Sequence, residues 1–309
     1  MQIALRLCSG LIAAASVVAL APLAAERPSA AQSSRRPMKI FISADMEGIT
    51  GVVQPAQLGP TGFEYARARE WMTGEVKAAI EAARAAGAAE FVVADSHGNA
   101  QNLLIDQLPD DVRVVRGFPR PLSMMQGIDD TFSAAIYIGY HASEFGVDVV
   151  RGHTFSSARL LGVKINGAEV SEGIFNAAIA GHFGVPVAFI SGDRGAVTQL
   201  QRAVPSVEGV IVKEGLGYHS AVTVTPARGQ AMIREGVTRA LGKLSALQPY
   251  RVKTPVELEV GFKLTLDAER VSYIPGVSRV DAHTVRTTLP DMLQAVRLTQ
   301  IMSSLEPPP

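Results

Sequence analysis

The chain has 309 residues, of which 47% are hydrophobic and 6% are aromatic, and its formal net charge is zero because 29 basic residues balance 29 acidic ones. A chain without excess positive charge and with few aromatic side chains is not expected to bind nucleic acid, either as a duplex or as a stacked single strand. The length suffices for one large domain.

Residues 1–31 are expected to be a secretory signal peptide with its cleavage region. An apolar run at residues 11–23 is too short to span a membrane, and small residues at Ala25 and Ala31 offer two cleavage positions. The single cysteine, Cys8, lies in this segment, so the mature chain would have neither a disulfide nor a thiolate ligand. We expect an exported, periplasmic protein with no membrane contact after signal cleavage.

The remaining chain is expected to form a linker at residues 32–37, a single domain at 38–305 and a tail at 306–309. Within the domain, short apolar runs alternate with amphipathic stretches. Strands are predicted at residues 40–44, 90–94, 112–115, 134–138, 160–165, 186–190 and 209–213, and helices at 64–86, 172–182 and 226–244. This alternation predicts an α/β fold of three layers, with a mostly parallel sheet flanked by helices.

The pattern changes in the last part of the domain. Residues 255–264 alternate between apolar and polar, like a half-exposed strand, and they are followed by a strand at 285–288 and a closing helix at 291–302. These elements predict a smaller C-terminal α+β portion. Earlier in the chain, Asn166-Gly167 predicts a hairpin turn after the strand at 160–165.

Three of the predicted strands end in side chains that can bind a metal. Asp45 and Glu47 follow the first strand with one residue between them, so in extended backbone both carboxylates point the same way. His97 follows the second strand and His141 the fourth. Because the carboxyl ends of parallel strands form the ligand crevice of open α/β sheets, we expect these side chains to meet there. Oxygen and imidazole ligands without sulfur favour zinc in a hydrolytic site, with manganese or cobalt as substitutes.

Other polar residues have a structural explanation as good as the functional one. His153 could simply brace a loop, and Glu172 stands at a predicted helix start, where the helix dipole favours an acid. Asp193 fits a turn as well as a pocket, and Asp95, two residues before His97, could orient a metal ligand. Three further histidines have no spacing that indicates a function, and we interpret them as structural or surface residues: His182, His219 and His283.

Five short motifs occur along the chain in a fixed order. They are Ser43-Ala44-Asp45-Met46-Glu47-Gly48, Asp95-Ser96-His97-Gly98, Gly139-Tyr140-His141-Ala142, His153-Thr154 and Ser171-Glu172. In this order they resemble the zinc-dependent D-aminopeptidases of the DppA type. The resemblance covers the chain from Met38 to Leu305.

The resemblance implies a metallopeptidase domain with two zinc ions per subunit. The implied zinc ligands are Asp45, Glu47, His97, His141 and Glu172. His153 matches the residue that the family uses as its catalytic group, described as a nucleophile, whereas the residues themselves leave open a nucleophile, a general base or a general acid. The family hydrolyses the N-terminal residue from short peptides, prefers D-amino acids such as D-Ala, and assembles as ring-like homo-oligomers, decamers in the type case.

Two features depart from the family pattern. Arg194 stands where members often carry a second acid, so the charge of the pocket is expected to differ, and the expected export contrasts with the cytoplasmic type enzyme. Two alternatives stay open. One is an L-specific aminopeptidase or amidase on the same centre, and the other is a non-catalytic periplasmic protein that binds a peptide or a metal. The second predicts two similar lobes, a duplication that the sequence does not show.

Overall fold

The larger of two sheets has seven strands in the order β3-β2-β1-β4-β7-β8-β9. They are β1 (Met38–Ala44), β2 (Ala88–Asp95), β3 (Val112–Val115), β4 (Ala134–Tyr140), β7 (Val187–Asp193), β8 (Glu208–Gly217) and β9 (Ser220–Thr223). All neighbours pair in parallel except β8 and β9, which are antiparallel. The structure is a computed structural model and describes residues 37–304. The predicted signal peptide, the tail and all of the linker except its last residue lie outside the described residues.

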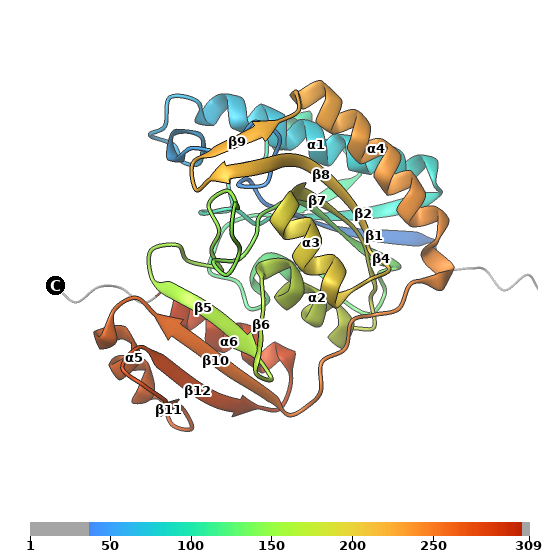
Figure 1. Cartoon of the computed structure of the whole chain (residues 1–309). Helices are drawn as coiled ribbons and strands as arrows, with labels where there is room; N and C mark the ends of the chain where they lie inside the picture. The colour runs from blue at the N-terminus through green and yellow to red at the C-terminus, as the bar shows by residue number, and fades with distance from the viewer. Residues whose placement is uncertain (1–36, 305–309) are drawn as a thin grey trace, which may run out of the picture. The chain divides into compact units, whose positions relative to one another are not determined.

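The first strand is apolar on both faces because both faces of this sheet are covered. Ile40 and Ile42 belong to the hydrophobic cluster under α1 (Tyr65–Ala85) and α4 (Pro226–Gly242). Phe41, pointing the opposite way, belongs to the cluster under α2 (Glu172–His182) and α3 (Arg194–Ala203). Figure 1 shows the two helix pairs on opposite sides of the sheet. The predicted three-layer α/β fold is confirmed.

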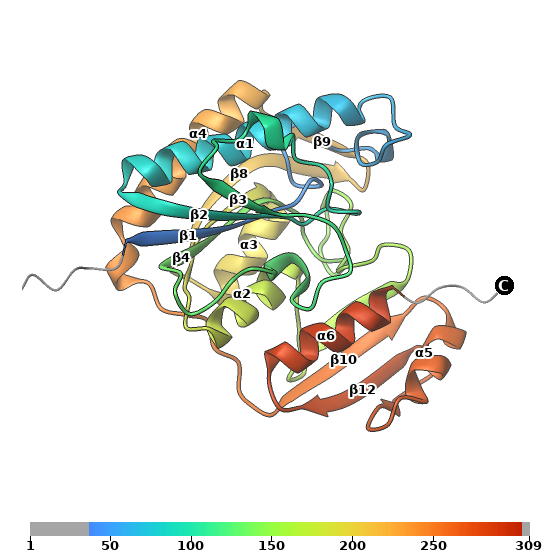
Figure 2. The ribbon, with the colours of Figure 1, turned by 180° about the vertical axis from the view of Figure 1, so that it is seen from behind.

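The smaller sheet has five antiparallel strands in the order β11-β12-β10-β5-β6. They are β5 (Leu160–Ile165), β6 (Ala168–Glu169), β10 (Val256–Phe262), β11 (Ser278–Arg279) and β12 (Thr284–Leu289). Two helices accompany this sheet, α5 (Thr265–Ser272) and α6 (Met292–Ser303), and α6 packs between the sheet and α2. Figure 2 shows α6 lying along β10 and β12.

The smaller sheet differs from the prediction in one respect. The predicted α+β portion was placed wholly at the C-terminus, but the hairpin of β5 and β6, from the middle of the chain, pairs with β10. The reason is that the chain leaves the parallel sheet after β4, and the strand that pairs with β5, β10, lies near the C-terminus. Two short helices, α3 and α5, were not predicted, because eight and ten residues are fewer than the roughly 11 over which a helical period is recognised.

Short 3₁₀ turns complete the described chain: η1 (Pro55–Gln57), η2 (Ile105–Gln107), η3 (Ser123–Met125) and η4 (Leu244–Ala246). Residues 37–304 all belong to one compact unit. Among these residues, no helix is long and apolar enough to cross a membrane.

Gly48 shows how tightly the turn after β1 packs on β4. A Cβ at this position would lie 2.0 Å from the carbonyl oxygen of Tyr140. The Gly48 amide donates a hydrogen bond to the carbonyl of Gly139 at 2.7 Å. Only glycine allows the two backbones to approach this closely, so the turn that carries Asp45 and Glu47 is fixed against the end of β4.

Candidate metal centre

The three predicted strand ends meet because their strands are neighbours. β1 lies between β2 and β4, and all three run in parallel. Asp45 and Glu47 follow β1, His97 follows β2 and His141 follows β4, so all four side chains come to the same edge of the sheet. Each of them is at least 93% buried. The expected convergence is therefore present in the structure.

One half of the cluster is built around His97. Its Nδ1 lies 2.7 Å from Oε2 of Glu47 and 3.4 Å from Oδ1 of Asp45. Its Nε2 lies 2.8 Å from the carbonyl oxygen of Leu58, which accepts its proton. This bond fixes the ring so that Nδ1 faces the two carboxylates, which is the orientation that a metal-binding imidazole needs.

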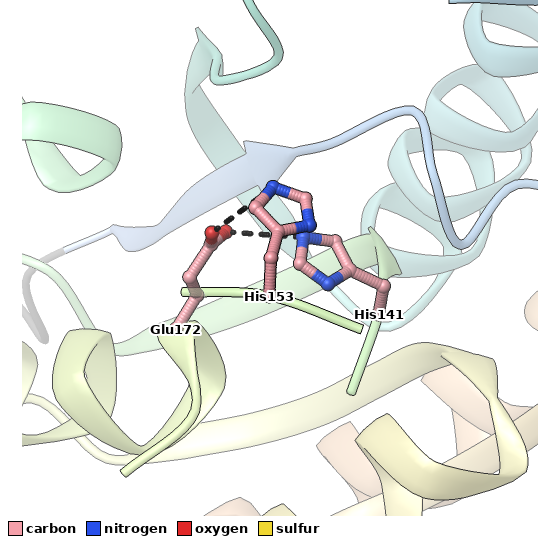
Figure 3. Close-up of side chains that lie close together, drawn as sticks. All are labelled: His141, His153 and Glu172. Carbon is pink, nitrogen blue, oxygen red and sulfur yellow. Dashed lines mark ion pairs between the residues drawn. The ribbon is translucent and has the colours of Figure 1, made fainter. Parts of the chain in front are cut away.

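The other half of the cluster is built around His141, His153 and Glu172. Nε2 of His141 lies 3.4 Å from Oδ2 of Asp45 and 3.5 Å from Oε2 of Glu172. Nε2 of His153 lies 3.9 Å from Oε1 of Glu172. Figure 3 shows the two imidazole rings side by side, with the Glu172 carboxylate facing both. The structure thus brings together every residue that sequence analysis selected for the site.

The local structure explains why His153 and Glu172 reach the cluster. Ser171 caps α2, its side chain accepting from the amide of Ile174, so Glu172 is the first residue of the helix. His153 lies on the segment that connects β4 to β5, and its backbone amide donates to the carbonyl of Ala142. Gly152 allows this close approach, since a Cβ there would lie 2.7 Å from the carbonyl oxygen of Ser143.

Backbone carbonyls hold both stacked histidines in one tautomer. Nδ1 of His141 donates to the carbonyl of Ala142 at 2.9 Å, and Nδ1 of His153 donates to the carbonyl of Arg151 at 2.8 Å. Each ring is then left with its Nε2 lone pair directed at the carboxylates. A lone pair in this position can bind a metal or take up a proton.

Burial and crowded charges shift the pKa values of the cluster. Burial, with Glu47 beside it, raises the pKa of Asp45 to about 7. Burial alone would raise the pKa of Glu47, but the neighbouring His97 holds it well below its ordinary value. Burial also lowers the pKa of His153, and the charge of His141 lowers it further. Three carboxylates buried together repel one another, and a cation between them would relieve this repulsion.

The donor set fits zinc. Two groups of three residues each place one ligand atom per residue within 4.8 Å of the others, namely Asp45, Glu47, His141 and His141, His153, Glu172. Oδ2 of Asp45 is buried without a hydrogen-bond partner among the described residues. Carboxylate oxygens and imidazole nitrogens are zinc ligands of hydrolytic sites, and an unpartnered buried carboxylate oxygen needs such a partner.

The cluster lies in the wall of a cavity of about 780 Å³. Besides the cluster, the wall includes Phe118, Phe155 and Arg151, together with Gln300 and Ile301 of α6. A cavity of this size accommodates a ligand as large as a short peptide. Because α6 comes from the C-terminal portion, that portion also contributes to the wall of the cavity.

Lys213 is a buried residue next to the site that the sequence did not reveal. It lies on β8 with 1% of its surface exposed, and its ammonium donates to the backbone carbonyls of Glu47, Ile49 and Val52. Burial lowers its pKa to about 8. A lysine within an apolar strand was the only available signal. Its position ties the turn that carries Glu47 to the sheet.

The remaining polar residues lie where a structural role is sufficient. Asp95 accepts from the amides of Asn102 and Leu103 and so braces the loop after β2, rather than the His97 ring. Asp193 caps α3 by accepting from the amide of Ala196. His182 and His219 are exposed, and His283 donates to the carbonyl of Phe262.

Arg194 pairs with Glu214 at the surface, and neither residue is in the cavity wall. Arg194 therefore does not alter the lining of this cavity, contrary to the expectation from sequence.

Acids and histidines at the carboxyl ends of parallel strands, lining a cavity large enough for a short peptide, form the site of a metal-dependent hydrolase. A model of the D-aminopeptidase family matches residues 38–301. The D-aminopeptidase of Bacillus subtilis strain 168 is 30% identical over 272 residues, which are 87% of this chain and 97% of that protein. The chain belongs to the D-aminopeptidase family.

The fold agrees with this assignment. The chain resembles the solved structure of the Zn-dependent D-aminopeptidase DppA from Bacillus subtilis, described as a self-compartmentalizing protease. The TM-score is 0.84 at 30% identity, and the match covers 87% of this chain and 97% of that one. The family predicted from five short motifs is therefore confirmed.

Proposed function

We propose that this protein removes the N-terminal residue from short peptides, with preference for D-amino acids such as D-Ala, through a centre of two zinc ions. The observation that carries the proposal is that two groups of possible ligands share His141. The first contains Asp45 and Glu47, with His97 beside them, and the second contains Glu172 and His153, of which we assign Glu172 to the metal and His153 to the substrate. Two overlapping groups suit two neighbouring metal ions. The names of the related B. subtilis proteins support zinc and a D-amino acid substrate.

Five residues would hold the zinc ions: Asp45, Glu47, His97, His141 and Glu172. Zinc, when bound, polarises the scissile carbonyl and lowers the pKa of water. Leu58 and Ala142 supply the carbonyls that orient His97 and His141. These outer contacts keep each ring nitrogen aimed at the carboxylates and would raise the affinity for the metal.

His153 would be the catalytic residue. Its Nδ1 proton is held by the Arg151 carbonyl, so its Nε2 lone pair faces the cavity. From there it can remove a proton from the attacking water and pass it to the leaving amine, or attack the carbonyl itself. Glu172, 3.9 Å away, would stabilise the imidazolium that forms in the first of these routes.

Assembly and location extend the proposal. The related DppA is described as self-compartmentalizing, which supports a homo-oligomer for this chain. We infer a decamer from the resemblance of the five motifs to the family. The signal-peptide pattern of residues 1–31 supports export to the periplasm, where D-Ala peptides from wall turnover would be at hand. A deletion strain that grows as well as the parent on D-Ala-D-Ala as nitrogen source would count against this role.

Zinc content and stereopreference test the proposal together. The mature protein, purified without chelator, should contain about two zinc ions per chain, and a variant with Asp45→Ala and Glu47→Ala should lose most of them. A panel of D- and L-aminoacyl anilides and dipeptides then separates the D-specific enzyme from an L-specific aminopeptidase or amidase. A parent that takes up no zinc and cleaves no member of the panel would reject the proposed hydrolysis.

A further inference from the structure

Arg151 lies in the wall of the cavity, on the segment that carries His153. Its backbone is held at both ends, since its amide donates to the carbonyl of Tyr218 at 2.9 Å and its carbonyl accepts from Nδ1 of His153. Its φ of 53° is in the left-handed region, which a residue without special constraint avoids. The backbone therefore keeps this arginine at one position beside the catalytic histidine.

The guanidinium of Arg151 has no acidic partner in the described part of the chain. Its Nε is buried and makes no hydrogen bond there, and the group lies 5.8 Å from the ring centroid of Tyr218. The Tyr218 ring supplies no hydrogen-bond acceptor in the plane of the guanidinium, so the buried Nε has lost its water contacts without gaining a hydrogen bond. Arginine in a ligand cavity most often meets this need by binding a carboxylate or a phosphate in a bidentate pair.

The charges around the cavity narrow the choice of anion. Among the described residues that line it, Arg151 is the only arginine or lysine, whereas Asp45, Glu47 and Glu172 supply the negative charge. A short peptide carries one ammonium and one carboxylate. The ammonium is attracted to the three acids of the cluster, and the carboxylate is attracted to Arg151, the single basic side chain of the wall.

We propose that Arg151 binds the C-terminal carboxylate of the peptide substrate and so makes the enzyme select dipeptides with a free carboxyl end. This inference rests on the proposed function, because it assigns a second contact to the same substrate. Arg151 lies two residues before His153. One short segment of the enzyme therefore carries both the group that acts on the scissile bond and the group that binds the substrate carboxylate. Arg151 is a specificity-determining residue in this scheme, whereas His153 performs the proton transfer or attack.

Binding of two uncleavable ligands tests the inference. The first is D-Ala-D-Ala with its amide reduced to a methylene-amine and its carboxylate free, and the second is the same compound as the C-terminal carboxamide. Calorimetry with the zinc-loaded parent should show at least about tenfold tighter binding of the carboxylate form. Arg151→Met, which keeps the aliphatic stem, should reduce this ratio to about one, and Arg151→Lys should restore part of it.

Two further measurements separate specificity from folding. Arg194→Met removes a surface arginine that is outside the cavity wall, and it should leave the ratio unchanged. With cleavable substrates, Arg151→Met should raise KM for D-Ala-D-Ala by a larger factor than KM for D-alanine anilide, which has no carboxylate.

The outcomes distinguish this inference from the proposed activity. An Arg151→Met protein that still prefers the carboxylate ligand overturns the inference, even if the parent hydrolyses D-Ala-D-Ala. A parent that binds neither ligand also overturns it. A parent that cleaves no peptide, but prefers the carboxylate ligand through Arg151, keeps the inference and rejects the proposed hydrolysis.

Discussion

The imidazole rings of His141 and His153 are stacked, with centroids 4.1 Å apart and planes inclined by 12°. The two rings have different proposed roles, since His141 would bind zinc and His153 would act on the substrate. Both present Nε2 to the carboxylate of Glu172. Geometry alone would allow either ring to be a ligand, so variants at His153 are the decisive ones.

His153→Ala is expected to lower kcat about 1,000-fold on D-Ala-D-Ala, because the group that moves the proton or attacks is gone. Zinc content should stay at the parent level, as measured by elemental analysis. His182→Ala, which removes an exposed histidine, is the matched control and should be fully active. A loss of half the zinc in His153→Ala would make His153 a ligand.

Lys213→Met should destabilise the fold by about 3 kcal/mol in urea unfolding, because three buried carbonyls lose their donor. It should also weaken zinc binding about tenfold, since the turn that carries Glu47 is no longer held to β8. Lys243→Met, at an exposed position, serves as the control. Unchanged zinc affinity would show that Lys213 supports only the fold.

Gly48→Ala should cost about 3 kcal/mol of unfolding free energy, because the added Cβ would lie 2.0 Å from the Tyr140 carbonyl oxygen and backbone must move. Gly59→Ala is the control, since nothing lies within 4 Å of a Cβ there, and it should change stability by less than about 0.5 kcal/mol. Equal stability of the two variants would contradict this packing argument.

Glu75 should make stability depend on pH. Its carboxylate accepts from the Thr50 amide, and burial raises its pKa from 4.5 to about 7. Between these values the unfolded chain ionises first, so the free energy of unfolding falls as pH rises. The full cost, about 3 kcal/mol, is present above pH 7 and vanishes below the unfolded pKa.

Glu75→Gln removes this titration and still offers an oxygen to the Thr50 amide. It should match the parent at pH 4.5 and exceed its stability by up to about 3 kcal/mol at pH 8 in denaturant titrations. The control Glu81→Gln, an exposed residue paired with Arg234, should show no such difference between the two pH values. A constant offset for Glu75→Gln at both pH values would contradict the shifted pKa.

The sequence predicted best those elements whose own residue pattern indicates their structure. Residues 40–44 are apolar except for Ser43 because β1 is covered on both faces, and the helix predicted at 172–182 has the same bounds as α2. The convergence of Asp45 and His141 follows from strand order, since parallel neighbours end at the same edge. Glu172 and His153 needed the family resemblance, because a helix start and a loop explain them equally well.

Contacts between segments that are far apart in the chain could not be predicted from the sequence. Lys213 is polar in a buried strand, and only the structure shows the three carbonyls that compensate its burial. The pairing of β5 with β10 joins segments far apart in the chain, and no local pattern specifies such a partner. No sequence motif singles out Arg151, and its proposed function follows only from its position in the cavity wall.

The pairing of β5 with β10 also sets an order of events during synthesis. All six residues of the proposed site have been synthesised once Glu172 is joined to the chain. At that stage β5, which follows the segment that carries His153, still lacks its partner strand β10. That neighbour and α6, which closes part of the cavity wall, are made last. A chain still emerging from the ribosome therefore has the groups needed for hydrolysis and no finished site, so peptide cleavage should begin only when the C-terminal helix has docked.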